Sequence, residues 1–217
     1  MNLRVLTKTP ISRAEFARAI QEADRSLSKA SAGILYGQYA LECGQGSACW
    51  NWNIGNVKVR REQAEAGRPF VMLPNTWEIE NGVRRVYQPP HEQTWFRAYE
   101  TLSEAMVEHL AFLRRRYASA WAHVLSGDAR AFVAALKRGG YFTGDELAYA
   151  NSVAWFQRAF ASVAWEEGEV PEPSEPFGGI VHGSHVVDWA LDQREADMLA
   201  ALADVGSFGR YDEEGTT

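Results

Sequence analysis

The sequence lacks the features that mark several large classes of protein. Two cysteines among 217 residues can form neither a disulfide framework nor a four-thiolate zinc site. No apolar run approaches the roughly 18 residues of a membrane span, and no apolar stretch follows the basic residues near the start of the chain, so a cleavable secretory signal is not expected. Hydrophobic residues at 46% and aromatic residues at 12% exclude intrinsic disorder for most of the chain. These features predict a soluble globular protein that is made in the cytoplasm.

The net charge of −6 hides an uneven distribution of charge along the chain. Residues 165–217 contain thirteen acidic and two basic residues, a net charge of −11. Residues 1–164 therefore carry a net charge of +5. A modestly basic body suits an anionic polymer as partner, whereas the acidic end does not.

Apolar periodicity predicts that the body is mainly helical. Ser12 and Glu15 have the spacing of a capping box at the start of a helix over 12–27. Gly44 and Gly46 follow a second helical segment over 31–43 and favour its termination. The pair Asn81-Gly82 lies between two apolar segments and predicts a β-hairpin. Further helices are predicted over 102–115, 121–124, 128–138 and 147–163.

The C-terminal part of the chain has a different composition. Residues 165–183 are rich in proline, glutamate and glycine, which predicts a linker. Residues 184–217 contain an acidic amphipathic helix over 186–205. The predicted fold class is thus mainly α, of the α+β kind: a helical domain over 1–164 with a small β-hairpin lobe, followed by a tethered acidic helix. That helix would dock onto a partner protein, lie over the basic body and restrain it, or act as a solubilising extension.

Glu42 is the position that most directly indicates chemistry. A glutamate in the last turn of a helix opposes the negative end of the macrodipole, and an apolar wall would hold its proton more tightly. Such a carboxyl can act as the general acid in glycoside cleavage. The alternative is a surface glutamate before a glycine cap. Aromatic and amide side chains suited to a polysaccharide groove gather in the non-helical middle of the chain, although some of the tryptophans would be core residues: Trp50, Trp52, Trp77, Trp95, Asn51, Asn53, Asn56 and Gln93.

Five short motifs, in order, resemble those of glycoside hydrolase family 73 in the lysozyme-like superfamily. The segment Ala-Leu-Glu-Cys-Gly-Gln-Gly at 40–46 is similar to that family's Ala-Leu-Glu-Ser-Gly-x-Gly signature. Thr-Trp-Glu-Ile at 76–79 resembles its Thr-x-Glu-Tyr hairpin. The other three are Asn-Trp-Asn-Ile-Gly-Asn-Val-Lys at 51–58, Trp-Phe-Arg-Ala-Tyr at 95–99, and Gly-Tyr-Phe-Thr through Tyr-Ala at 140–150. Together they cover roughly residues 30–164.

The resemblance implies a peptidoglycan hydrolase, an endo-β-N-acetylglucosaminidase that needs no metal or cofactor. By position, Glu42 would be the general acid, Glu78 the second carboxylate acting on water, and Tyr149 a residue that lines the cleft near Glu42. Ile79 stands where the family pattern has tyrosine, so Glu80, two residues on and on the same face of a strand, is an alternative to Glu78. The expected substrate-binding residues are Trp50, Trp52, Asn53, Trp77, Glu80, Trp95 and Tyr141.

Other functions remain open on the sequence. A lytic transglycosylase or a muramidase would use Glu42 alone, and a non-catalytic wall-binding or structural module would use no acid. The expected partner is the glycan strand of bacterial cell wall, with a protein partner for the acidic end as a further possibility. Without a recognisable export signal, the protein would reach the wall by phage-type release, as part of a tail or injection apparatus, or by an export route that the sequence does not reveal.

The remaining reactive residues favour structural interpretations. Cys43 could be a nucleophile beside a histidine (His91, His109 or His123), but no Cys-His constellation is recognisable. Cys43 and Cys49 could pair as a disulfide or remain as two free, half-buried thiols. The pair His182 and His185 has a spacing that some metals accept, but a solvated loop is favoured. The run Arg114–Arg116 fits a helix C-terminus better than a nucleic-acid site, so no nucleic-acid partner is expected.

Overall fold

The structure is a computed structural model that describes residues 1–44, 48–80, 83–142 and 144–165. The side chains of Ile79 and Glu80 also lie outside this description. The predicted linker, the predicted acidic helix and the pair His182 and His185 fall almost entirely or entirely outside the described residues. Their structures, and the boundary between body and tail, therefore remain predictions.

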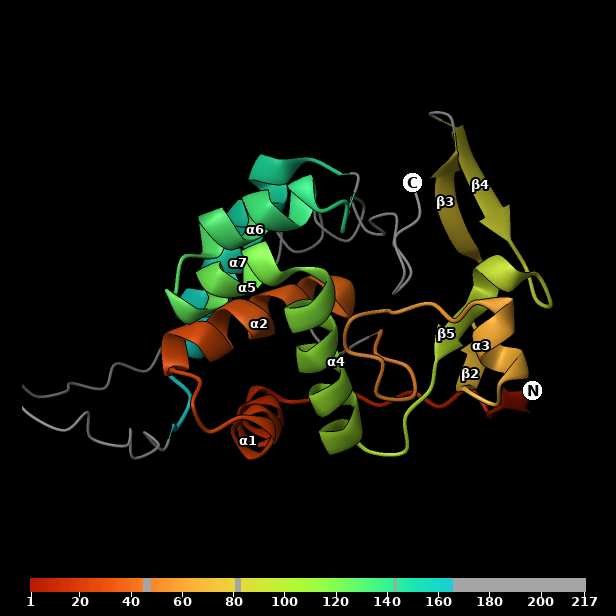
Figure 1. Ribbon diagram of the computed structural model, residues 1–217, viewed down its shortest axis with the longest axis horizontal. Helices are drawn as coiled ribbons and strands as arrows, with labels where there is room; N and C mark the ends of the chain where they lie inside the picture. Colours follow the sequence, from red (N-terminus) through yellow and green to blue (C-terminus); the bar gives the residue numbers. More distant parts are fainter. Residues whose placement is uncertain (45–47, 81–82, 143, 166–217) are drawn as a thin grey trace, which may run out of the picture.

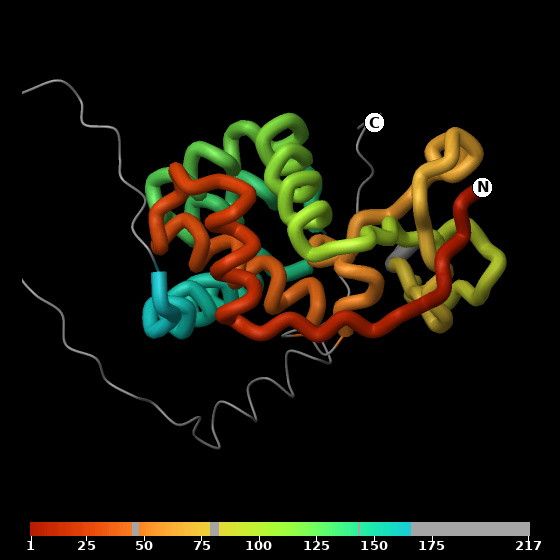
Figure 2. Tube along the Cα trace, turned by 90° about the horizontal axis from the view of Figure 1, so that it is seen from below, coloured from red at the N-terminus to blue at the C-terminus, as the bar shows by residue number. Residues whose placement is uncertain are grey.

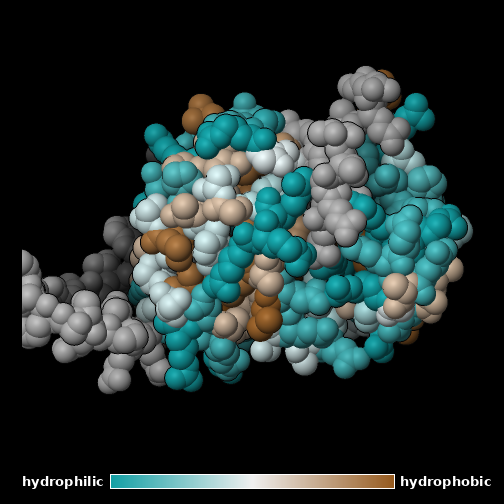
Figure 3. Space-filling view, viewed as in Figure 1, coloured by the Kyte–Doolittle hydropathy of each residue, from teal (hydrophilic) through white to brown (hydrophobic). Residues whose placement is uncertain are grey.

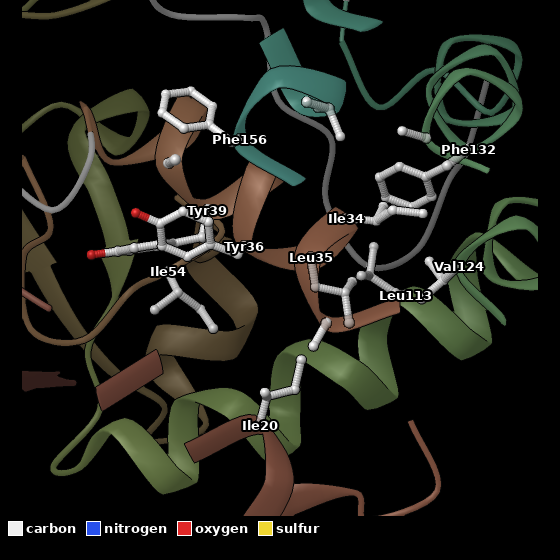
Figure 4. Packing of buried hydrophobic residues seen from close by; sticks show 14 of the residues in the cluster. Ile20, Ile34, Leu35, Tyr36, Tyr39, Ile54, Leu113, Val124, Phe132 and Phe156 are labelled. Atoms are coloured by element: carbon white, nitrogen blue, oxygen red, sulfur yellow. The ribbon is translucent and has the colours of Figure 1, made fainter. Parts of the chain in front are cut away.

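Helix α2 (Lys29–Glu42) is the central element of the fold. Ser28 caps its N-terminus by accepting a hydrogen bond from the backbone N–H of Ser31. Nearly every residue of α2 is buried, as expected for a helix with apolar side chains on all faces. Figure 4 shows Ile34, Leu35, Tyr36 and Tyr39 of this helix surrounded by apolar side chains from the neighbouring helices.

Helix α7 (Glu146–Phe160) packs along α2 at very short range. An added Cβ at Gly37 would lie 2.7 Å from the backbone oxygen of Val153, a distance that real Cβ atoms do not reach. Glycine at this position therefore allows the two helix backbones to approach, and this approach brings the C-terminal end of α2 beside Tyr149 of α7.

The remaining helices confirm the predicted helical body (Figure 1). The capping box between Ser12 and Glu15 is present, and the helix it begins ends at Ala23, four residues earlier than predicted. A short helix that periodicity did not predict precedes the strand over Pro69–Met72. The helices other than α2 and α7 are α1 (Arg13–Ala23), α3 (Arg61–Glu65), α4 (Leu102–Arg116), α5 (Ala118–Leu125) and α6 (Ala129–Arg138).

Strands form a lobe beside the helices. The predicted hairpin is confirmed, with β3 (Thr76–Glu80) antiparallel to β4 (Val83–Tyr87). A three-stranded sheet that the sequence did not predict has the order β1 (Asn2–Leu3), β2 (Pro69–Met72) and β5 (Trp95–Arg97). The 3-10 turn η2 (Glu92–Thr94) leads into β5.

The N-terminal segment links the two parts of the molecule. It runs from the sheet along one side of the body to α1, as the red tube in Figure 2 shows. On the face drawn in Figure 3, hydrophilic residues dominate the strand-containing lobe, whereas apolar residues are more frequent over the helices. No helix among the described residues is long and apolar enough to cross a membrane.

Candidate active site

The side chain of Glu42 is buried at the C-terminal end of α2. Only 7% of the residue is exposed, and its Oε1 accepts a hydrogen bond from the hydroxyl of Tyr149 at 3.3 Å. Tyr149 is itself buried on α7, 107 residues later in the chain. The structure thus brings together the predicted general acid and the predicted cleft tyrosine.

The ring of Tyr149 is held by its surroundings. It stacks on Phe142 with the ring centroids 4.3 Å apart and an interplanar angle of 9°. The ammonium of Lys137 lies over the ring of Phe142, with its Nζ 5.1 Å from the ring centroid. The same ammonium donates a hydrogen bond to the backbone oxygen of Gly144 at 2.7 Å. These contacts fix the direction from which the tyrosine hydroxyl reaches Glu42.

The loop after Cys49 is organised by two buried asparagines. Asn53 donates hydrogen bonds to the backbone oxygens of Val57 (2.9 Å) and Arg97 (3.1 Å) and accepts one from the backbone N–H of Val57 (2.8 Å). Asn56 adopts a left-handed φ of 50°, which asparagine tolerates, and donates to the backbone oxygen of Glu42. This bond satisfies one of the carbonyls that a helix C-terminus leaves unpaired.

The second predicted carboxylate lies on the hairpin, in contact with a buried lysine. Lys58 is 8% exposed, and its ammonium donates to Oε1 of Glu78 on β3 and to Oε1 of Gln93 in η2. The same ammonium lies 5.8 Å from the ring centroid of Phe96. The side chain of Glu78 is 17% exposed, so this carboxylate is partly accessible. Residue Arg85 faces it across the hairpin.

The four tryptophans proposed for the substrate groove occupy different environments. Trp50, Trp52 and Trp77 are half-buried, and the guanidinium of Arg84 lies 4.4 Å from the ring centroid of Trp77. Trp95 is 5% exposed, packs against Phe70, and donates its indole N–H to the backbone oxygen of Pro90. Its ring therefore packs inside the protein, in line with the expectation that some of these tryptophans are core residues.

Other residues proposed to bind substrate also lie inside the protein. The amide of Asn53 is occupied by the loop contacts described above, and the residue is 3% exposed. Tyr141 is 6% exposed; its hydroxyl donates to the backbone oxygen of Gly55 at 3.4 Å, and its ring packs edge-on against Tyr117. Glu80 ends β3, and its side chain lies outside the described residues.

Cys43 and Cys49 are free thiols in the structure, and both are fully buried rather than half-buried as expected. The Cys43 thiol contacts the backbone oxygen of Asn53 at 3.4 Å. A hydrogen bond from Cys43 lowers the pKa of the Cys49 thiol, against the effect of burial. Because neither sulfur is exposed, a nucleophilic role toward a polymer is disfavoured.

His109 is a buried residue that the sequence did not single out as a packing element. Its ring contacts the side-chain oxygen of Gln38 at 3.3 Å, one turn of α2 before Glu42, and packs against Gly55. Burial, assisted by the nearby charge of Arg97, lowers its pKa to about 4. The imidazole is therefore neutral at pH 7 and supports the loop and helix that carry the site.

Side-chain environments among the described residues also bear on the arginine run and on the possibility of a metal site. The arginine run ends α4, where Arg114 pairs with Asp24 and lies 4.5 Å from the ring centroid of Trp121. Among the described residues, no group of three or more histidine, cysteine, aspartate or glutamate side chains could hold a metal ion.

The chain matches no family model and no curated protein sequence. It is similar to the solved structure of a mutant peptidoglycan hydrolase from Sphingomonas sp. A1, with 27% identity and a TM-score of 0.52 over 69% of this chain and 96% of that chain. A second structure, of a point mutant of peptidoglycan hydrolase from the same organism, matches with 22% identity and a TM-score of 0.46 over 69% of this chain and 90% of that chain. The predicted α+β lysozyme-like fold is confirmed.

Proposed function

We propose that this chain hydrolyses the glycan strands of bacterial peptidoglycan, with Glu42 as the general acid. The observation that carries the proposal is the buried Glu42 carboxyl in contact with the Tyr149 hydroxyl, in a fold similar to that of a peptidoglycan hydrolase. Removal from water disfavours the charged form of a carboxyl. The site therefore suits an acid that keeps its proton until the leaving oxygen takes it.

The cleavage step needs a proton donor on one side of the glycosidic bond and a nucleophile on the other. Glu42 gives its proton to the bridging oxygen as the bond from that oxygen to the anomeric carbon breaks. Water attacks the anomeric carbon, and Glu78 takes the proton that the water loses. Lys58 bonds Oε1 of Glu78, so Oε2 is the oxygen assigned to this proton.

Tyr149 orients the acid in this scheme. Its hydroxyl donates to Oε1 of Glu42 at 3.3 Å, and we assign the transferred proton to Oε2. The half-buried Trp50, Trp52 and Trp77 are the residues assigned to stack on sugar rings. By resemblance to family 73, the bond cut is the β-1,4 bond that follows N-acetylglucosamine.

Substitution of the acid tests this proposal. We expect Glu42→Gln, which keeps the shape but carries no transferable proton, to slow the loss of turbidity of purified peptidoglycan by about 100-fold or more. Glu65→Gln is the matched control, since Glu65 is exposed at the end of α3, and should retain wild-type activity. Wild-type protein that sediments with peptidoglycan but leaves it intact would instead show a binding module.

The place of action follows from the substrate. Peptidoglycan lies in the cell wall, and release by a phage or delivery by an apparatus remains a prediction. The predicted partner protein of the acidic segment over 184–217 also remains a prediction.

A further inference from the structure

Two residues of one short segment contact the elements that carry the two carboxylates. Asn56 donates to the backbone oxygen of Glu42 at the end of α2. Lys58, two residues later, donates to the carboxylate of Glu78 on the hairpin. The segment Asn56–Lys58 therefore lies between the helix that ends in the acid and the strand that presents the second carboxylate.

This segment is itself fixed by backbone hydrogen bonds to β5. The backbone oxygen of Val57 accepts from the N–H of Arg97 at 2.9 Å, and the N–H of Val59 donates to the oxygen of Trp95 at 3.1 Å. The side-chain amide of Asn53 also connects this segment to β5, because it donates to the backbone oxygens of both Val57 and Arg97. A segment held in this way cannot shift without breaking several contacts at once.

Burial couples the ammonium of Lys58 to Glu78. Lys58 is 8% exposed, and a buried ammonium is costly unless it is paired and hydrogen-bonded. The carboxylate of Glu78 supplies the opposite charge, and Gln93 supplies a second acceptor. Movement of Glu78 away from the site would break its ion pair with this buried ammonium, so the ion pair restrains the carboxylate.

The hairpin has need of such a restraint. Figure 1 shows β3 and β4 extending away from the helical body, and Val83 and Val86 of β4 are exposed. A two-stranded hairpin with little apolar burial is only marginally stable by its own contacts. The ion pair at the middle of β3 and the contact with the neighbouring turn η2 connect the hairpin to the domain.

We propose that Lys58 is the positioning residue of Glu78, and that the segment Asn56–Lys58 fixes the position of this carboxylate relative to the helix that ends in Glu42. The inference rests on the proposed function, because it assigns Glu78 the role of base. A misplacement of about 1 Å at a reacting group can cost roughly 100-fold in rate. Lys58 itself touches neither water nor sugar in this scheme.

Substitutions at Lys58 separate its charge from its shape. Lys58→Met keeps the length of the stem and removes the ammonium, and we expect kcat on soluble peptidoglycan fragments to fall by about 10- to 100-fold while KM changes by less than about 3-fold. Lys58→Arg keeps the charge and should restore part of the lost kcat. Lys29→Met, at the opposite end of α2 from the acid, is the matched control and should retain wild-type kinetics.

A double-mutant cycle with Glu78→Gln distinguishes positioning from general structural support. If Lys58 acts through Glu78, Lys58→Met should lower kcat no further once Glu78 is Gln. Losses that multiply would overturn the inference, as would a Lys58→Met protein with wild-type kcat. Should Lys58→Met fail to fold, Gln93→Leu loosens the same ammonium and should lower kcat by about 3- to 10-fold only while Glu78 is present.

The same experiments distinguish failure of the proposed function from failure of the inference about Lys58. Wild-type protein that does not cleave peptidoglycan would overturn that function and this inference together. Cleavage that requires Glu42 but is unchanged in Glu78→Gln would leave the function standing and overturn the inference alone, because Lys58 would then have no catalytic carboxylate to position.

Discussion

At the scale of single residues, the site depends on polar groups that the fold has removed from water. Glu42, Lys58 and His109 are each less than a tenth exposed. Each has a polar contact with a side chain from another element: with Tyr149, with Glu78 and with Gln38, respectively. Polar groups in such positions are costly to leave unpaired, so the site and the packing around it are stabilised by the same contacts.

The depressed pKa of His109 predicts a dependence of stability on pH. The unfolded chain binds a proton at His109 below about pH 6.5, whereas burial keeps the folded imidazole neutral down to about pH 4. The free energy of unfolding should therefore fall by about 3 kcal/mol as the pH drops through this window. Urea unfolding of wild type and His109→Gln at a series of pH values measures the effect. The variant should lose less stability toward acid, and parallel curves would contradict the assignment.

Side-chain environments were the least predictable part of the site. The sequence indicated Glu42 through its place at a helix end as well as motif resemblance, and Glu78 and Tyr149 through resemblance alone. The structure places Glu42 and Tyr149 in contact. The sequence did not identify Lys58 as a partner of Glu78, although the lysine lies within a quoted motif. Trp95 and Asn53 are residue types that often line glycan-binding grooves, but both are buried. Residue type alone does not determine which side of a loop faces the core.

At the scale of elements, close packing of α2 on α7 sets the position of Tyr149 relative to Glu42. The limiting contact is at Gly37, where the backbone oxygen of Val153 leaves no room for a Cβ. The α2 and α7 helices also make the most extensive contact between two elements of the described chain, with Tyr36 of α2 packed against Phe156 and Phe160 of α7. Displacement of either helix would therefore change the position of Tyr149 relative to Glu42.

Gly37→Ala is expected to separate the two helices. Alanine favours the helix by about 1 kcal/mol relative to glycine, but the forced shift of the Val153 backbone should outweigh this gain and destabilise the protein by about 1–3 kcal/mol. Activity on peptidoglycan should fall as well, since α7 carries Tyr149. Thermal unfolding and turbidity assays measure the two effects.

Gly33→Ala is the control for this substitution, because it adds a Cβ to the same helix with a milder steric conflict. The added Cβ would lie 3.0 Å from Cγ and 3.2 Å from the backbone oxygen of Gln157, both longer than the 2.7 Å contact at Gly37, so the loss of stability should be smaller. Equal stability and activity of Gly37→Ala and the wild type would contradict the assigned role of the α2–α7 contact.

Elements with strong local signals were predictable, and those made by distant pairing were not. Capping residues and apolar periodicity located the helices to within a few residues, and the hairpin followed from its turn. The sheet of β1, β2 and β5 has strands of two to four residues, too short to show alternation. Its partners lie far apart in sequence, with Leu3 beside Phe70 and Phe70 beside Arg97, and such pairing leaves no local pattern.

At the scale of the whole molecule, the fold places a helical body beside a strand-containing lobe and sets one carboxylate on each. Glu42 belongs to the body, and Glu78 belongs to the hairpin. The segment Asn56–Lys58 contacts both. In the proposed mechanism, this arrangement delivers a proton from one side and water from the other, so that the glycan strand is hydrolysed.

Digestion of purified peptidoglycan in heavy-oxygen water, followed by mass spectrometry of the fragments, tests this mechanism most directly. We predict new reducing ends on N-acetylglucosamine that carry one heavy oxygen and that are absent after digestion with Glu42→Gln. Unlabelled 1,6-anhydro ends would contradict hydrolysis and indicate a transglycosylase. Labelled ends on N-acetylmuramic acid would contradict the assigned bond, and intact glycan would contradict the enzyme itself.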